Sequence, residues 1–333
     1  RGLGDVYKRQ IVNFSLVNNT FQMTKSILTI TLNPTVDKST SVDHIKPEKK
    51  LRCEKPRYEP GGGGINVSRG LVRLGFDSTA FFPSGGRTGK LLEELLAEEN
   101  VKTLPASVKA ETRENFIVVE TSHNGQYRFG MPGEDILPEE ADAIFNTITS
   151  LSPTPDITVI SGSLPPGIDA TYIGKLVKAL KDKGSLIIAD TSGDALTEVL
   201  KQGVYLLKPN LGELSTLTGQ TELDNDSADE AAKQLVDEGK AEIVVVSLGP
   251  QGAYLVSKDE CIFVPAPSVK KRSTVGAGDS MVAGMVSVLS RGGSLTEMAR
   301  MGVACGSAAT MAEGTGLFTK ENAEKLYKWL SKS

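Results

Sequence analysis

A carboxylate stands inside a glycine-rich turn near the C-terminus, directly before a strongly apolar stretch. Residues 273–280 read STVGAGDS, and MVAGMVSVL begins at the next position. Gly276 and Gly278 let the backbone approach a ligand closely, and a helix that begins here directs free N–H groups at that ligand. Because a carboxylate repels a passively bound anion, Asp279 fits a group that takes a proton while the amides stabilise a transferred phosphoryl group. A plain glycine turn in which Asp279 caps the helix is an equal alternative.

A second polar motif, LKPNLGE, covers residues 207–213 and follows a β-rich run. Open α/β sheets bind ligands at this end of their strands. Asn210 and Glu213 are three residues apart, so they share a helix face and could meet a hydrated Mg²⁺ and a nucleotide phosphate. The same spacing is typical of a helix capping box, which is the more frequent local outcome.

Four consecutive glycines, Gly61 to Gly64, precede the helical pattern INVSRGLVRLG. Bare backbone would let a sugar pack closely, and Asn66 could bond its hydroxyls. The dinucleotide fingerprint GxGxxG fails at Asn66. The phosphate-binding P-loop pattern also fails at its nearest approach, where Ser84 replaces the first glycine and Leu91 follows Gly89-Lys90. Both classes of nucleotide-binding enzyme are therefore disfavoured.

Two further loops follow β-rich runs: SGSLPPG at 161–167 and VSLGPQGA at 246–253. The second could line an adenine pocket or be only a hairpin. Four cations, Lys50, Arg52, Arg113 and Arg128, fall in two alternating polar segments. Charged edge strands often serve only to prevent aggregation, but cations over a glycine-rich site would also hold a phosphorylated substrate.

The elements that must position these motifs alternate between strand and helix. Near-continuous apolar strands alternating with helices predict a mostly parallel sheet covered on both faces, an α/β fold. We expect a small β lid built from about 38–59 and 111–131, with strands over 38–45 and 49–59 and a hairpin turn at Asn124-Gly125. Further strands are expected at 26–32, 79–83, 157–161, 186–190, 205–208, 243–247, 253–256 and 261–264, and helices at 65–74, 88–99, 138–150, 169–183, 211–218, 227–239, 279–291, 295–311 and 320–332.

Composition limits the possible functions. The chain has 333 residues and a net charge of −4, so nothing attracts nucleic acid or an anionic membrane globally. Its 3 cysteines lack CxxC spacing and its 2 histidines lie outside any motif, which argues against disulfides, a zinc site and Ser/His/Asp chemistry. No apolar run is long enough to cross a membrane, and a reducing cytoplasm fits best. Residues 1–22 show no clean period and are interpreted as a leader or artefact, which leaves 23–333 as one domain.

Taken in this order, the motifs resemble the ribokinase-like PfkB family of carbohydrate kinases from about Lys25 to the C-terminus. GAGD is the family's most specific signature and NxxE the next. The glycine run and the segments KLRC, QYRFGMPG and SGSLPPG are most similar to the bacterial branch that phosphorylates fructose 6-phosphate. The resemblance implies a mostly parallel sheet with a β lid that serves as a homodimer interface, and MgATP as the phosphoryl donor.

The resemblance also implies a role for each motif residue. Asp279 would be the base, and Gly276, Ala277 and Gly278 the anion hole. The sugar phosphate would contact Asp37, Lys50, Gly62, Gly63, Gly64, Asn66, Arg113 and Arg128, and ATP would contact Lys208, Asn210, Glu213, Ser247, Gly249 and Gly252. Glu213 would meet Mg²⁺ through water, and K⁺ would bind the backbone carbonyls of Ser273, Val275, Ala309, Ala312, Gly314 and Gly316.

Three alternatives stay open from the sequence. Sister enzymes with the same motifs phosphorylate tagatose 6-phosphate or fructose 1-phosphate, although a lysine often interrupts the glycines in the latter. A non-catalytic nucleotide-sensing module on the same fold would be expected to lack Asp279. A hydride-transfer enzyme would need the glycine fingerprint that fails here.

Overall fold

The computed structural model describes residues 24–123, 125–220 and 223–332. Its central sheet has nine strands in this part of the chain, and seven consecutive members are parallel. The last two strands pair antiparallel at one edge. The order across the sheet is β13 (Cys261–Pro265), β12 (Gly252–Ser257), β11 (Ala241–Ser247), β10 (Val204–Leu207), β9 (Leu186–Asp190), β8 (Ile157–Ser161), β1 (Ile27–Ile30), β4 (Thr79–Ser84) and β5 (Lys102–Ser107).

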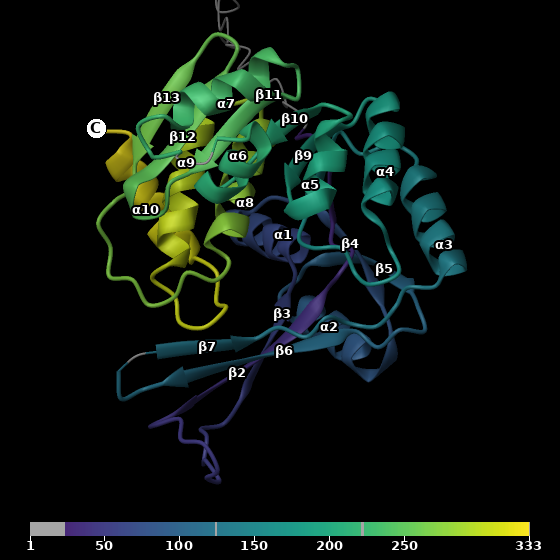
Figure 1. Cartoon of the computed structure of the whole chain (residues 1–333), viewed down its shortest axis with the longest axis vertical. Coiled ribbons are helices and arrows are strands. Elements are labelled where there is room, and N and C mark those ends of the chain that lie inside the picture. The colour runs from purple at the N-terminus through teal and green to yellow at the C-terminus, as the bar shows by residue number, and fades with distance from the viewer. Residues whose placement is uncertain (1–23, 124, 221–222, 333) are drawn as a thin grey trace, which may run out of the picture.

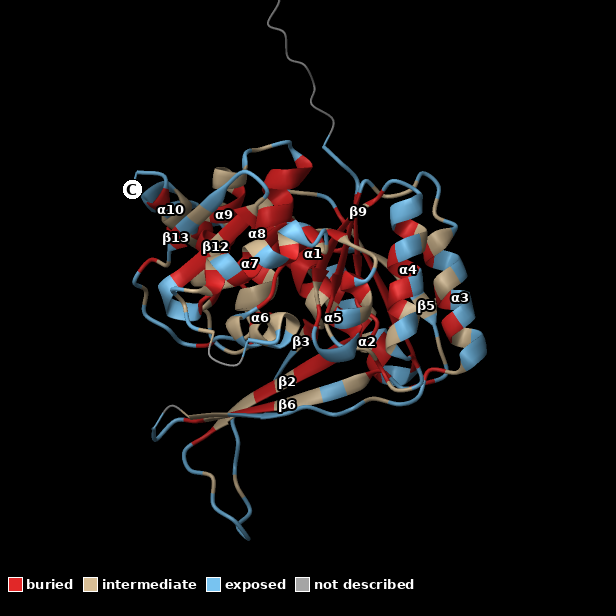
Figure 2. Cartoon of the chain, turned by 45° about the horizontal axis from the view of Figure 1, so that its top comes forward, coloured by how far each residue is buried: buried red, intermediate tan, exposed pale blue. Residues whose placement is uncertain are grey.

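Helices cover both faces of this sheet, as the near-continuous apolar strands predict (Figure 2). Every residue of β8 is buried, since its side chains meet a helix layer on each side. One layer consists of α3 (Pro138–Thr149), α4 (Ala170–Asp182), α5 (Gly193–Leu200), α6 (Leu211–Thr218) and α7 (Ala228–Asp237). The other consists of α1 (Gly63–Leu74), α8 (Ala277–Ser290), α9 (Leu295–Ala309) and α10 (Lys320–Leu330), while α2 (Gly86–Glu98) packs at the β4 end.

A separate four-stranded sheet extends away from the central one (Figure 1). It consists of β3 (Arg57–Gly61), β2 (Thr35–Val42), β6 (Arg113–Glu120) and β7 (Gly125–Phe129). The parallel pairing of β2 with β6 joins the two polar segments that the sequence predicts to form one lid. The expected strand over 49–59 is wrong at 49–56, which has no regular structure, because only 57–61 pairs with β2.

Two elements escaped the sequence pattern. β5 contains Pro105, which indicates a non-strand or an edge strand, and β5 is indeed the edge. Helix α5 is only eight residues long and starts at Gly193, so it offers little more than two turns in which to recognise a helical pattern. The β6–β7 hairpin is confirmed, although Asn124 and the interpreted leader 1–22 lie outside the described residues.

Two negative expectations can be compared with the described residues. Cys53, Cys261 and Cys305 are all free thiols, in line with the absence of CxxC spacing. None of the helices in the described ranges combines the length and the apolar character needed to cross a membrane.

Helix α8 carries the GAGD turn at its start and is held in place by a close crossing with α9. Gly284 lies at this crossing, where an added Cβ would be 2.6 Å from the Met301 carbonyl oxygen and 3.0 Å from the Cys305 sulfur. A backbone atom cannot move aside as the end of a side chain can. The crossing therefore requires glycine at this position and fixes the depth at which α8 lies against its neighbour.

Gly284→Ala should lower the free energy of unfolding by about 1–3 kcal/mol, because the methyl group overpacks the α8–α9 crossing. Urea denaturation followed by circular dichroism measures this change. Gly174→Ala in α4 is the matched control: its added carbon would have its nearest contact at 3.3 Å, so the gain from restricting glycine offsets the tight fit. Equal stability of Gly284→Ala and wild type would contradict the close crossing.

Candidate active site

Asp279 lies in the first turn of α8, whose N-cap is Gly276 in the left-handed region at φ 71°. No side chain caps this helix, so its first N–H groups are left for a ligand and Asp279 does not act as the cap. A positive φ favours glycine at residue 276. The turn therefore presents backbone donors and a carboxylate at one place, as the sequence predicts.

Asn66 from α1 donates its amide nitrogen to Asp279 Oδ2 at 2.9 Å. Asn66 is buried, and apolar residues of its helix α1 pack against those of α8 in one cluster. The glycine run and the GAGD turn are thereby joined in one site. We regard this bond as the structural centre of the candidate site.

An ion pair lies beside the turn, at the ends of two neighbouring strands. Lys208 follows β10, and its Nζ is 3.0 Å from Oδ1 of Asp190 at the end of β9. A Cβ added to Gly278 would lie 3.5 Å from the same Nζ, which places the ammonium beside the GAGD turn. Burial acts to lower the pKa of Lys208, but the carboxylates of Asp190, Glu213 and Asp279 outweigh it and raise the pKa. Lys208 is thus a buried permanent cation.

The surroundings of Asp279 favour its protonated form at mild pH. Desolvation and the neighbouring charge of Asp190 raise its pKa from 3.8 to about 7, against the opposing effects of Asn66, Lys208 and Arg69. A base works best when its pKa is near the operating pH. The carboxylate can therefore accept a proton in a reaction near neutrality.

Asn210 and Glu213 form the capping box that the sequence offered as the more frequent alternative. Asn210 Oδ1 accepts from the Glu213 N–H and Glu213 Oε2 accepts from the Asn210 N–H, each at 2.9 Å. The Glu213 charge nevertheless acts on Lys208. Structural capping does not remove Glu213 from the site, since the box fixes its carboxylate near the ammonium.

The glycine run is required by packing as well as by any ligand. A Cβ at Gly63 would lie 2.1 Å from Ser161 Oγ, and one at Gly64 would lie 2.7 Å from the Ile30 carbonyl oxygen. Gly62 has φ 115°. These contacts bring the start of α1 against the SGSLPPG loop, so both motifs border the same place.

A second polar cluster lies on the lid strands. Asp37 on β2 is buried and accepts from the Asn115 amide at 3.0 Å; burial raises its pKa. Arg113 on β6 donates to the carbonyl oxygens of Met131 and Asn33, and its Nε is buried without a partner among the described residues. A cavity of about 430 Å³ borders Arg113 but is also lined by Glu111, Glu114 and Glu134 and by none of the residues around Asp279.

Two loops that the sequence assigned to a cation lie side by side. The N–H groups of Arg272 and Ser273 both donate to the Thr310 carbonyl oxygen, at 2.8 and 3.3 Å. Among the residues 24–123, 125–220 and 223–332, no group of three or more His, Cys, Asp or Glu side chains could hold a metal ion. Carbonyl oxygens suit a hard cation such as K⁺.

Residues 24–322 match the sequence model described as pfkB family carbohydrate kinase. The chain belongs to this family. It is 46% identical over 307 residues to ATP-dependent 6-phosphofructokinase isozyme 2 of Escherichia coli K12, covering 92% of this chain and 99% of that relative. Crystal structures of Escherichia coli phosphofructokinase-2 in complex with fructose-6-phosphate and with potassium match with TM-scores of 0.87 and 0.89, at 44% and 45% identity, each over 92% of this chain and 99% of the other.

The other predicted site residues of this pfkB kinase lie in three separate segments. Lys50 is exposed in the connection between β2 and β3, which projects away from the central sheet (Figure 1). Arg128 is exposed on β7 but reaches Thr274 beside the GAGD turn, with Nη2 3.4 Å from Oγ1. The VSLGPQGA motif is a hairpin of β11 and β12 that contains Ser247, Gly249 and Gly252 and pairs with Asn210.

Three residues of the candidate site were not identified from the sequence. Asp190 ends the strand LIIAD, so the rule that flagged residue 208 could have found it. Glu59 accepts from the Thr315 hydroxyl at 2.7 Å and so joins the lid to the loop after α9. Arg69 is buried beside Asn66, where the apolar helical pattern around it gave no sign of a charge in the core.

Asp279→Asn should stabilise the folded kinase increasingly as the pH rises. Between pH 3.8 and about 7 the unfolded carboxyl is ionised while the folded one keeps its proton, so wild-type stability falls with pH in this window. Asparagine removes this loss. The melting temperature of the variant minus that of wild type should grow from pH 4 to pH 7 and then level off. A difference that stays constant from pH 4 to pH 8 would contradict the raised pKa.

Proposed function

We propose that this chain is an ATP-dependent 6-phosphofructokinase that phosphorylates the 1-hydroxyl of fructose 6-phosphate. The observation that carries the proposal is the half-buried Asp279 carboxylate at an uncapped helix start, with a pKa near 7. The Escherichia coli relative named above carries this activity in its name, and the match covers 99% of its length. The residues present suffice for phosphoryl transfer, which depends on positioning and charge stabilisation.

In this proposal Asp279 accepts the proton of the sugar's 1-hydroxyl. The hydroxyl oxygen then forms a bond to the γ-phosphorus, while the bond from that phosphorus to the β–γ bridging oxygen breaks and ADP leaves. The N–H groups of Gly276, Ala277 and Gly278 stabilise the charge on the phosphoryl group. Lys208 adds a fixed positive charge beside Gly278.

The remaining ATP contacts are assigned to the carboxyl ends of β10 and β11. Their position beside the Asp190–Lys208 pair supports this assignment, since open α/β sheets bind ligands there. The nucleotide would extend from Lys208 along Asn210, Glu213, Ser247, Gly249 and Gly252.

Two cations complete the proposal. Mg²⁺ would be held near Glu213 through water, and when bound it neutralises charge on the ATP phosphates. K⁺ would bind carbonyl oxygens of the two adjoining loops beside the anion hole and strengthen its positive field. The hydrogen bonds from Arg272 and Ser273 to Thr310 support this location. The carbonyls assigned to K⁺ are those of Ser273, Val275, Ala309, Ala312, Gly314 and Gly316.

The sugar phosphate would lie between the glycine run and the lid. Asp37, Gly62, Gly63, Gly64 and Asn66 would bond its hydroxyls. Arg113 would meet the phosphate through its unpartnered Nε, since an unsatisfied buried donor is costly and an anion would satisfy it. Lys50 and Arg128 are assigned as further cations of the lid.

We also infer one kinase domain over 23–333, whose four-stranded lid serves as a homodimer interface. Four large apolar side chains are exposed on and next to the lid strands, which supports pairing with a second copy. They are Tyr58, Tyr127, Phe129 and Met131.

An ADP-release assay with MgATP, with and without K⁺, should give a higher kcat/KM with fructose 6-phosphate than with tagatose 6-phosphate or fructose 1-phosphate. Asp279→Asn should lower kcat about 10²–10⁴-fold, because the general base is lost. Asp182→Asn, an exposed carboxylate on α4, is the control and should leave kcat unchanged. Another preferred sugar would change the substrate; binding of ATP with no turnover would favour the nucleotide-sensing module.

Arg113→Ala should raise the KM for fructose 6-phosphate about tenfold or more and leave the KM for ATP unchanged, because a charge-assisted bond to the phosphate is lost. Lys50→Ala, measured in parallel, should raise the same KM. Lys38→Ala is the control and should leave this KM unchanged, because the ammonium group of this lid cation lies over the Tyr58 ring. Unchanged KM values in the first two variants would mean that Arg113 and Lys50 take no part in binding the sugar phosphate.

A further inference from the structure

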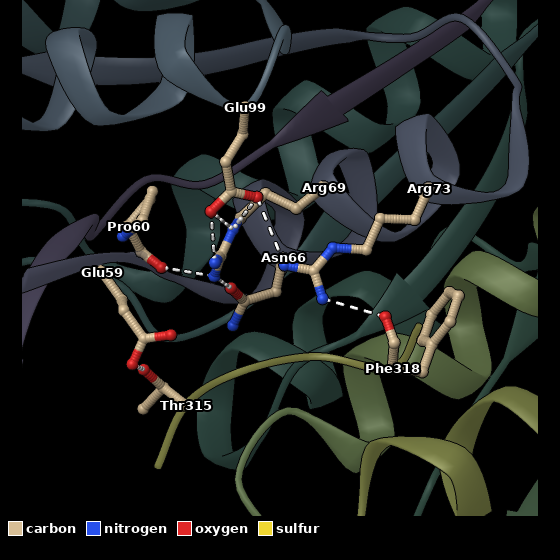
Figure 3. A network of polar contacts seen from close by, with 8 residues as sticks. All are labelled: Glu59, Pro60, Asn66, Arg69, Arg73, Glu99, Thr315 and Phe318. Carbon is tan, nitrogen blue, oxygen red and sulfur yellow. Dashed lines mark hydrogen bonds and ion pairs between the residues drawn. The ribbon is translucent and has the colours of Figure 1, made fainter. Parts of the chain in front are cut away.

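Arg69 is a fully buried guanidinium whose donors are directed at specific acceptors (Figure 3). Its Nε and Nη2 bind both oxygens of Glu99 at 2.6–3.0 Å. Its Nη1 donates to the Pro60 carbonyl oxygen at 2.8 Å and to Asn66 Oδ1 at 3.0 Å. Arginine is suited to such bidentate and forked contacts, which fix the orientation of both partners.

The contact to Arg69 decides which way the Asn66 amide faces. Its oxygen accepts from Arg69 and its nitrogen donates to Asp279 Oδ2. A flipped amide would set its NH₂ group against the guanidinium and its oxygen against the carboxylate. Both changes replace a hydrogen bond by a contact between like groups.

We propose that Arg69 is a positioning residue for phosphoryl transfer: it locks the Asn66 amide so that its nitrogen faces Asp279 and holds that carboxylate in one orientation. The inference deepens the proposed function and depends on it. Glu99 and Pro60 hold the guanidinium, which in turn holds Asn66. The chain Glu99–Arg69–Asn66–Asp279 therefore connects the end of α2 with the start of α8.

Arg69 also acts on Asp279 through its charge, which lowers the pKa of that carboxyl group. The charged groups that face Asp279 are Asp190 after β9, Lys208 after β10 and Arg69 on α1. Burial and Asp190 raise the pKa of Asp279, while the Asn66 bond, Lys208 and Arg69 lower it. Loss of Arg69 weakens two of the lowering influences, so the pKa of Asp279 should rise.

The test is Arg69→Met, assayed with saturating MgATP and fructose 6-phosphate from pH 6 to pH 9. We expect kcat at pH 7 to fall about 10- to 100-fold, as a misplaced reacting group implies. The KM for ATP should stay unchanged, and the acidic limb of the kcat profile should move to higher pH. Arg69→Lys keeps the positive charge but lacks the forked guanidinium group. It should therefore return the acidic limb of the pH profile closer to its wild-type position than it returns kcat to its wild-type value.

Arg73→Met is the matched control. Arg73 lies one turn further along α1, bonds the same Glu99 at 3.4 Å and donates to the Phe318 carbonyl oxygen at 2.9 Å. Within the described part of the chain, Arg73 makes no hydrogen bond to Asn66. Its loss should lower the melting temperature but leave kcat and the pH profile as in wild type.

Equal kcat and pH profiles for Arg69→Met and Arg73→Met would overturn the inference. If Arg69→Met does not fold, the double variant Arg69→Met/Glu99→Leu removes the buried pair together, which proteins often tolerate. It should show the same fall in kcat. Failure of the proposed function is a separate result, because wild type itself would then not phosphorylate fructose 6-phosphate.

Discussion

Asn66 and Asp279 are separated by 213 positions in the chain, yet one hydrogen bond of 2.9 Å joins them. This bond requires that α1 and α8 lie side by side on one face of the central sheet, with both helix starts at the same level. Close backbone contacts supply that precision. Gly63 and Gly64 bring the start of α1 against β8 and β1, and Gly284 brings α8 against α9. The position of Asp279 relative to Asn66 therefore depends on contacts that only glycine permits.

The groups around this bond shift the pKa of Asp279 in opposite directions. Asp190 and desolvation favour the proton on Asp279, whereas Lys208, Arg69 and Asn66 favour its release. The result is a carboxylate poised near neutral pH rather than one that is fully ionised. Such poise costs stability in the folded protein, a cost commonly found at catalytic sites. The Asp190–Lys208 ion pair contributes to both sides of this balance, since Asp190 raises the pKa of Asp279 and Lys208 lowers it.

Much of the fold and the outline of the site could be predicted from sequence, because apolar runs and turn residues report local structure directly. The GAGD turn, the NxxE motif and the glycine run all lie at helix starts, as predicted. Side-chain partners across the core could not be predicted in this way. Arg69 occupies a buried position on α1 where its charge is paired with that of the distant Glu99, and no local pattern reports that pairing. The connection at 49–56 was predicted as strand since alternation alone does not show whether a pairing partner exists.

The structure makes Asp279 a carboxylate poised to take a proton near neutral pH. The most direct test follows the carboxyl carbon of Asp279 by ¹³C nuclear magnetic resonance during a pH titration, with the signal assigned by its absence in Asp279→Asn. We expect a titration midpoint near pH 7. A midpoint at or below about pH 4, the ordinary value for an aspartate, would contradict it.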